Sequence, residues 1–94
     1  MFKDRATADI FAGSDSKAAR KVCPSSLHEL ARRKLVVLVS AGQMTDLLMP
    51  PGNQLEEPHG DRQGQHSIRI NTQYRICFVW TEQGATEVEI VDYH

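Results

Sequence analysis

The C-terminal half of the chain alternates between apolar and polar positions, as half-buried β-strands do. Residues 66–70 place two isoleucines on one side of a strand and a serine and an arginine on the other. The polar triplet at 71–73 predicts a turn. Residues 74–80 and 86–93 continue the alternation, so we expect antiparallel strands joined by short turns.

The N-terminal half instead repeats its apolar residues at helical spacings of three and four. A short helix is predicted at 7–11, ending at a glycine. Ser26 and Glu29 form a capping-box pattern, which opens a longer helix expected to run to about Ser40. Residues 13–24, between the two helices, are polar and basic and predict a loop.

An irregular passage separates the helices from the strands, because residues 50–52 read Pro-Pro-Gly. A first strand is expected near Asn53, and Pro58 confines it to an edge or to its end. Helices followed by hairpin-linked strands predict an α+β domain, with two N-terminal helices packed on one face of a small antiparallel sheet. Residues 1–94 form one domain, since a chain of 94 residues buries one modest core.

Composition narrows the class of protein. With 40% hydrophobic and 24% charged residues, the chain is typical of a soluble protein. Its longest apolar run, at 35–39, is far too short to cross a bilayer, and its first residues carry charge where a secretion signal is apolar. We therefore expect a cytoplasmic protein. Cys23 and Cys77 have no spacing typical of a zinc site, which predicts buried thiols and no metal.

Charge is divided unevenly along the chain. Residues 1–40 hold eight Lys/Arg and four Asp/Glu, a net +4, whereas residues 41–94 hold three and eight, a net −5. The sum is the −1 of the whole chain. A nucleic-acid binder must neutralise phosphates, so the N-terminal half is the candidate footprint.

Strand alternation places Arg69, Arg75 and Tyr93 on the side of the sheet that faces away from the core, so we expect them together on an open face. An arginine offers a planar charged fork for phosphate oxygens, and a tyrosine ring stacks on a base. Cross-strand pairing of an arginine with Glu87 or Glu89 is the alternative explanation.

RNA cleavage without a metal needs a base for the 2′-hydroxyl, a cation to stabilise charge on phosphorus and an acid for the 5′-oxygen. Histidine suits either proton role, because its ordinary pKa of about 6.5 lies near working pH. His59 and His94 are the candidates. Such cleavage would leave a 2′,3′-cyclic phosphate and require no cofactor.

Four segments carry a resemblance to a known family: GDRQGQHSIRINTQYRICFVW at 60–80, EIVDYH at 89–94, ARRKL at 31–35 and PPGNQLE at 50–56. They resemble the HigB branch of the RelE/ParE superfamily of toxins, the plasmid-maintenance killer proteins. The resemblance implies an α+β toxin of a type II toxin–antitoxin system that cuts mRNA on the translating ribosome and is nearly inert on naked RNA.

By resemblance the candidate catalytic residues are Arg75, Tyr93, His94, His59, Asp92 and Glu56. Arg75 looks like the family's phosphate-stabilising arginine, and the last three residues of the chain match its catalytic ending. His59 stands where relatives generally carry lysine, and Glu56 where some carry histidine. These two departures leave the assignment of acid and base open. The candidate RNA- or ribosome-binding residues are Lys17, Arg20, Lys21, Arg62 and Arg69.

The implied partner is a HigA-type helix-turn-helix antitoxin that forms a hetero-oligomer with the toxin. Val36, Val37 and Val39 lie outside the core stripe of the long helix and form either a wide core face or a partner-binding patch. Two other functions stay open: inhibition of DNA gyrase in the manner of ParE, and a catalytically degenerate domain that only binds its antitoxin.

Overall fold

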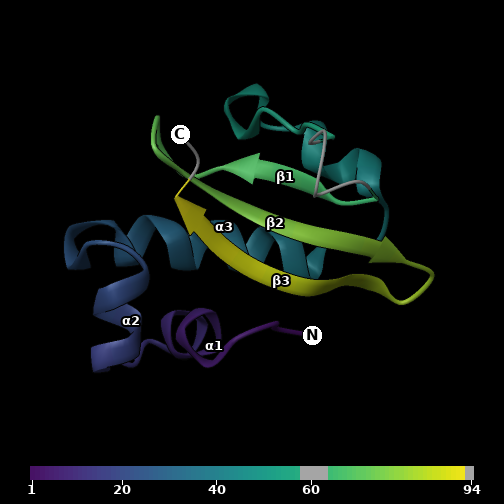
Figure 1. Cartoon of the computed structure of the whole chain (residues 1–94). Coiled ribbons are helices and arrows are strands. Elements are labelled where there is room, and N and C mark those ends of the chain that lie inside the picture. The colour runs from purple at the N-terminus through teal and green to yellow at the C-terminus, as the bar shows by residue number, and fades with distance from the viewer. Residues whose placement is uncertain (58–63, 93–94) are drawn as a thin grey trace.

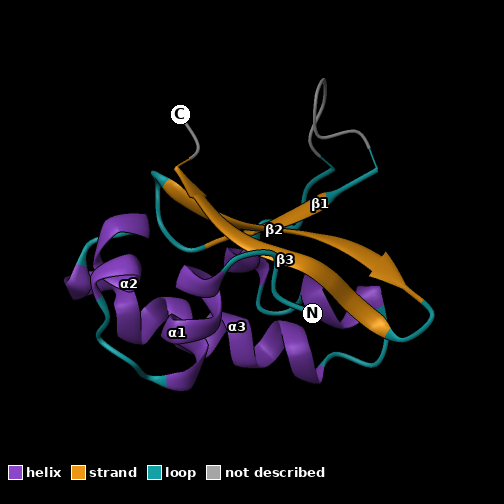
Figure 2. Cartoon of the chain, turned by 60° about the horizontal axis from the view of Figure 1, so that its bottom comes forward, coloured by secondary structure: helices purple, strands orange, loops and turns teal. Residues whose placement is uncertain are grey.

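The computed structural model describes residues 1–57 and 64–92 and has two layers, with helices packed on one face of an antiparallel sheet (Figures 1 and 2). The helices are α1 (Arg5–Ala12), α2 (Lys17–Val22) and α3 (His28–Ser40), with short 3₁₀ turns η1 (Ser25–Leu27), η2 (Met44–Leu48) and η3 (Pro51–Asn53). The strands are β1 (His66–Arg69), β2 (Tyr74–Thr81) and β3 (Gly84–Asp92). The predicted α+β class is confirmed, with three helices in place of two.

Helix α1 is fixed at both ends by its own sequence. The Asp4 side chain accepts a hydrogen bond from the Thr7 backbone N–H at 2.8 Å, and Gly13 ends the helix in the left-handed region at φ 80°. The Thr7 hydroxyl, fully buried, accepts from the backbone N–H of Ile90 at 3.2 Å. This contact joins α1 to β3 and ties the helical layer to the sheet.

Helix α2 lies inside the segment predicted to be a loop, so that prediction was wrong. Its N-cap is Ser16, whose hydroxyl accepts from the Ala19 backbone N–H at 3.0 Å and donates to the Asp9 carboxylate at 2.6 Å. Ala19 is fully buried against the core. Six residues are too few to show helical periodicity, and only the capping serine marked this helix in the sequence.

Helix α3 ends at Ser40, as predicted, but it begins differently. A 3₁₀ turn precedes it, and its N-cap Leu27 makes no side-chain capping bond, so the predicted capping box does not form. The buried residues of α3 are Ala31, Leu35 and Leu38. These face the sheet, as their spacing indicates.

The sheet has the order β1-β2-β3, with both pairs antiparallel. A β-bulge interrupts the second pair, where Glu87 adopts a positive φ of 53°. Each edge of the sheet is extended by one bridge: Phe2 runs parallel to Val88, and Glu56 is antiparallel to Ser67. The strand predicted near Asn53 is absent there, because that residue ends η3 and pairing begins only at the Glu56 bridge.

The core lies between the two layers, and Phe78 is the largest fully buried side chain. Cys23 and Cys77 are both buried, as predicted, and burial raises the pKa of the Cys23 thiol. Within residues 1–57 and 64–92, no helix has the length and apolarity needed to cross a membrane.

Candidate functional site

A pocket of about 260 Å³ opens on the face of the sheet opposite the helices, beside strands β1 and β2. Its described lining residues all have polar or charged side chains: Gln54, Glu56, Arg69, Asn71, Thr72 and Arg75. Three of these, Glu56, Arg69 and Arg75, are residues that the sequence predicted for the site. The volume is slightly below the range of about 300 to 1,000 Å³ typical of small-ligand sites.

Arg75 is held firmly within this pocket. Its Nε donates to the Ser67 hydroxyl at 2.8 Å, and its Nη2 donates to the backbone carbonyls of Ser67, at 3.3 Å, and of Gln54. The same Nη2 lies 3.6 Å from Oε1 of Glu56. These hydrogen bonds and the nearby opposite charge offset the cost of burying a guanidinium and hold it in a fixed orientation.

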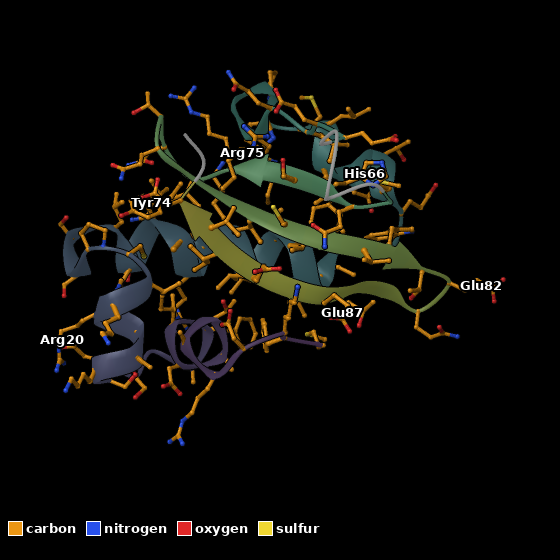
Figure 3. All side chains as sticks on the ribbon, viewed as in Figure 1. Arg20, His66, Tyr74, Arg75, Glu82 and Glu87 are labelled. Atoms are coloured by element: carbon orange, nitrogen blue, oxygen red, sulfur yellow. The ribbon has the colours of Figure 1, made fainter. Side chains whose placement is uncertain are left out.

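Strand alternation correctly placed Arg69 and Arg75 on the same face, since they are direct partners in the register of β1 and β2. The expectation that Arg75 is openly exposed was wrong, because only 6% of its surface is accessible. Its side chain crosses β1 and meets the segment 54–56, which alternation within the strands does not reveal. In Figure 3, Arg75 lies near the end of the sheet opposite that of Glu82.

Arg69 differs from Arg75 in its surroundings. Its side chain is half-buried, and within the described parts of the chain its guanidinium makes no side-chain hydrogen bond or ion pair. One arginine of the pocket is therefore fixed, and the other is available to a ligand. Among the described residues that line the pocket, Glu56 carries the one carboxylate beside two arginines, so the formal charge of this lining is positive.

The turn between β1 and β2 forms one wall of the pocket. The Asn71 side chain accepts from the backbone N–H groups of Gln73, at 2.9 Å, and Tyr74, at 2.7 Å, which fixes the turn. Thr72 is exposed at its tip. Nε2 of Gln73 donates to the Asp92 carboxylate at 3.1 Å, so the turn is joined to the end of β3. Asp92 therefore lies beside the pocket wall and does not line the pocket.

A model of the HigB-like toxin family, described as the RelE-like toxin HigB of type II toxin–antitoxin systems, matches residues 1–94. The chain belongs to this family. It is 40% identical over 81 residues to Toxin HigB-1 of Vibrio cholerae serotype O1, covering 86% of this chain and 82% of that protein. An uncharacterized protein of Haemophilus influenzae is 36% identical over 55 residues, covering 58% of this chain and 54% of that one. The resemblance found in the sequence is confirmed.

The HigB-like family assignment makes the protein a toxin of a type II toxin–antitoxin pair, and its partner is an antitoxin. Four residues predicted for the toxin's site, His59, Arg62, Tyr93 and His94, lie outside the described residues. Their roles stay predictions.

Of the basic residues predicted to bind RNA or the ribosome, Arg69 lines the pocket, whereas the three on α2 lie apart from it. Lys17, Arg20 and Lys21 are exposed on α2, in the helical layer, and Arg20 pairs with Asp15 at 3.5 Å. The valines considered for partner binding divide: Val36 and Val37 are 41% and 40% exposed, whereas Val39 is half-buried. The exposed pair therefore belongs to the surface of α3.

Two further histidines, His28 and His66, make structural contacts. Nε2 of His28 lies 3.0 Å from the carbonyl oxygens of both Ala19 and Cys23, where it closes the end of α2. The ring of His66 stacks on Phe78 with centroids 6.2 Å apart, and its Nε2 lies 3.7 Å from Glu57. Within the described ranges, no three His, Cys, Asp or Glu side chains gather in a group that could hold a metal ion.

Sequence reasoning missed three residues of the pocket: Gln54, Asn71 and Thr72. The signal for two of them was present, because the polar triplet 71–73 joins the two strands that carry Arg69 and Arg75. Gln54 had no such signal, since it contributes through its backbone carbonyl and left-handed conformation, φ 45°.

Proposed function

We propose that the protein is a ribosome-dependent mRNA endonuclease that inhibits translation, with the pocket between Arg69 and Arg75 as the place where the scissile phosphate binds. The observation that carries the proposal is the pairing of a fixed, buried arginine with an available one in a polar pocket. Membership of the HigB-like family supports the proposal, because the toxins of this family are RelE-like and resemble RNases of the RelE type.

In this mechanism the 2′-oxygen of the substrate attacks the adjacent phosphorus, and the bond from phosphorus to the 5′-oxygen breaks. The 2′-hydroxyl loses a proton to a general base, and the leaving 5′-oxygen gains one from a general acid. Negative charge grows on the non-bridging oxygens, and the Arg75 guanidinium is oriented to stabilise it. The products are a 2′,3′-cyclic phosphate and a 5′-hydroxyl, with no metal or cofactor involved.

Candidates for the proton transfers are Glu56, whose carboxylate is 55% exposed in the pocket, and His59, Tyr93 and His94. Asp92, tied to the β1–β2 turn, is the described residue that directly precedes the last two of the chain. Such a small set of catalytic groups gains most from a substrate that is already bent and held, which supports dependence on the ribosome.

We also propose a HigA-type helix-turn-helix antitoxin as the partner, in a toxin–antitoxin hetero-oligomer, and the cytoplasm as the place of action, because ribosomes work there. Val36 and Val37 are the exposed apolar residues of α3 and are candidates for antitoxin contact. The basic residues of α2 are candidates for contact with ribosomal RNA.

The test compares wild-type protein with Arg75→Lys on ribosomes that carry a defined mRNA. Lysine keeps the charge but lacks the fork that bonds Ser67, so kcat should fall by about 10²-fold or more. The matched control is Arg5→Lys at a side chain that is 88% exposed on α1, and it should cleave normally. Copurification with the antitoxin checks that each variant is folded.

Mapping of mRNA 5′ ends after brief induction in cells decides between the proposed function and its competitors. Cuts inside reading frames that disappear in Arg75→Lys are expected. Double-strand DNA breaks without mRNA cuts would show a gyrase inhibitor instead. Absence of both, with antitoxin binding intact, would show a domain that has lost catalysis.

A further inference from the structure

Behind the pocket, the side chain of Asn53 is buried, with 1% of its surface exposed, and its amide group is fully used. Nδ2 donates to the backbone carbonyls of Leu47 and Met49, each at 3.3 Å, and Oδ1 accepts from Nζ of Lys34 at 2.5 Å. The side-chain amide of Asn53 therefore links η3, to which it belongs, to α3 and to the end of η2. A buried network of this kind fixes a conformation when every member is satisfied.

The residues that follow Asn53 are those that hold the arginine of the pocket. Gln54 adopts the left-handed conformation, and its carbonyl accepts from Arg75. Glu56 then forms two backbone hydrogen bonds with Ser67, at 2.9 and 2.8 Å, and presents its carboxylate to the same guanidinium. A positive φ is strained at a non-glycine residue, so it persists only where the surroundings impose it.

Lys34 supplies the contact from the helical layer. Its side chain leaves α3 next to the buried Leu35, and burial lowers the pKa of its ammonium group. An exposed lysine would bond water at no cost, whereas this one is partly desolvated and donates to a buried amide. The contact therefore joins α3 to the segment 53–56. This segment lies beside the edge strand β1 and contributes Gln54 and Glu56 to the pocket.

We propose that Lys34 and Asn53 are positioning residues, which hold Gln54 and Glu56 against Arg75 and so set the orientation of its guanidinium. This inference rests on the proposed nuclease function. Neither residue lines the pocket, and both act through Gln54. Loss of the Lys34 contact leaves the side-chain Oδ1 of Asn53 buried without a donor. The segment 53–56 then relaxes away from Arg75.

The experiment uses Lys34→Met, which keeps the apolar stem and removes the donor. Its matched control is Arg33→Met, the neighbouring helix position, where the side chain is 70% exposed and pairs only with Glu29 on the surface. Lys34→Arg restores a donor and a charge. On programmed ribosomes we expect kcat for Lys34→Met to fall by about tenfold or more, with the half-saturating ribosome concentration unchanged. Lys34→Arg should recover most of the rate, and Arg33→Met should behave as wild type.

A second readout follows Arg75 directly through the NMR signal and hydrogen exchange of its Nε–H. In the wild type this proton, bonded to the Ser67 hydroxyl, should exchange slowly, and in Lys34→Met it should exchange at least about tenfold faster. Asn53→Asp, which cannot donate to Leu47 or Met49, should act in the same direction and provides an independent variant.

The two readouts separate failure of this inference from failure of the proposed function. An active wild type whose Lys34→Met variant keeps both kcat and slow Arg75 exchange would overturn the positioning role. Faster exchange with an unchanged kcat would overturn it as well, since orientation would then not matter for cleavage. A wild type that cleaves no ribosome-bound mRNA would refute the nuclease proposal, and the Arg75 exchange rate would still decide whether Lys34 and Asn53 hold the guanidinium.

Discussion

The two arginines of the pocket suit different tasks because their surroundings differ. Arg75 is desolvated and bonded to Ser67 and Gln54, so it cannot reorganise during a reaction. Charge stabilisation by such a preorganised group costs no reorganisation when negative charge develops. Arg69 is less buried and free to adjust, which favours a role in capturing substrate. An exchange to lysine should accordingly be worse at Arg75 than at Arg69, because only Arg75 uses its fork.

Glu56 is the residue whose role is most directly testable. Its carboxylate lies 3.6 Å from Nη2 of Arg75 and lines the pocket, and we propose it as a candidate to accept the proton of the 2′-hydroxyl. Glu56→Gln keeps the size of the side chain and the backbone bridge to Ser67 but removes the base. We expect kcat to fall by about 10²-fold, with little change in the half-saturating ribosome concentration.

Single-turnover cleavage on programmed ribosomes measures this change. The control is Glu57→Gln, the exposed neighbour whose carboxylate approaches His66 and not Arg75. If Glu56→Gln cleaves as fast as the wild type, Glu56 is only the ionic partner of Arg75, and the base is one of the candidate histidines.

At the scale of elements, strand alternation predicted the sheet well because each strand has one buried face. It correctly placed Ile68, Ile76 and Ile90 in the core, and Arg69 and Arg75 on one face of the sheet. Alternation could not reveal that Arg75 is covered, since the cover comes from a segment distant in sequence and acts through a backbone carbonyl.

The two wrong predictions, a loop at α2 and a strand near Asn53, have physical causes that local periodicity does not show. Helix α2 has six residues, fewer than two turns, so its apolar positions cannot show a repeat. The segment near Asn53 was predicted as a strand, yet the side chain of Asn53 bonds carbonyls of its own loop and stabilises η3 instead. Alternation therefore predicted the part of the site that rests on strands. In the segment 50–56 only Glu56 was predicted, through the family resemblance, and the contact of Gln54 with Arg75 was not.

Helix α2 should depend on its capping serine more than a longer helix does. Ser16 satisfies the Ala19 N–H and also donates to Asp9 of α1, so one hydroxyl both starts α2 and ties it to its neighbour. Ser16→Ala should lower the free energy of unfolding by about 1 kcal/mol, in the range of other N-cap losses. Urea denaturation followed by circular dichroism measures it.

Ser14→Ala is the matched control for this prediction, because Ser14 is exposed and its backbone N–H, bonded to the Asp9 carbonyl, is unchanged by the substitution. A Ser16→Ala variant as stable as Ser14→Ala would show that burial of Ala19, and not the cap, maintains α2.

At the scale of the whole molecule, acidic and basic side chains differ in their distance from the pocket. Figure 3 shows Arg20 at one end of the molecule and Glu82 at the other, at the β2–β3 turn, with Arg75 near the end of the sheet away from Glu82. Of the carboxylates in the acidic C-terminal half, Glu56 and Asp92 lie at the pocket, whereas Glu82 lies away from Arg75 and opposes RNA binding there less than its contribution to the net charge suggests. At physiological salt the Debye length is about 8 Å, so carboxylates at the far end are largely screened from the pocket.

This separation predicts that ribosome affinity depends on which charges are removed and not on net charge. In the double variant Lys17→Gln with Lys21→Gln, two exposed cations are lost from α2 while Arg20 keeps its pairing with Asp15. The half-saturating ribosome concentration should rise several-fold at constant kcat, because phosphate contacts position the protein without entering the chemistry. The slope of log affinity against log salt should become shallower by about one to two units.

Glu82→Gln with Glu87→Gln is the opposite control, since it changes net charge by the same amount at the end away from Arg75. Both glutamates are exposed, and neither lines the pocket. This variant should leave affinity and salt slope as in the wild type. If the glutamate variant strengthens ribosome binding as much as the lysine variant weakens it, affinity depends on net charge, and α2 makes no specific contact with the ribosome. If only the lysine variant responds, the helical layer holds the toxin on ribosomal RNA while the opposite face of the sheet presents Arg75 to the message.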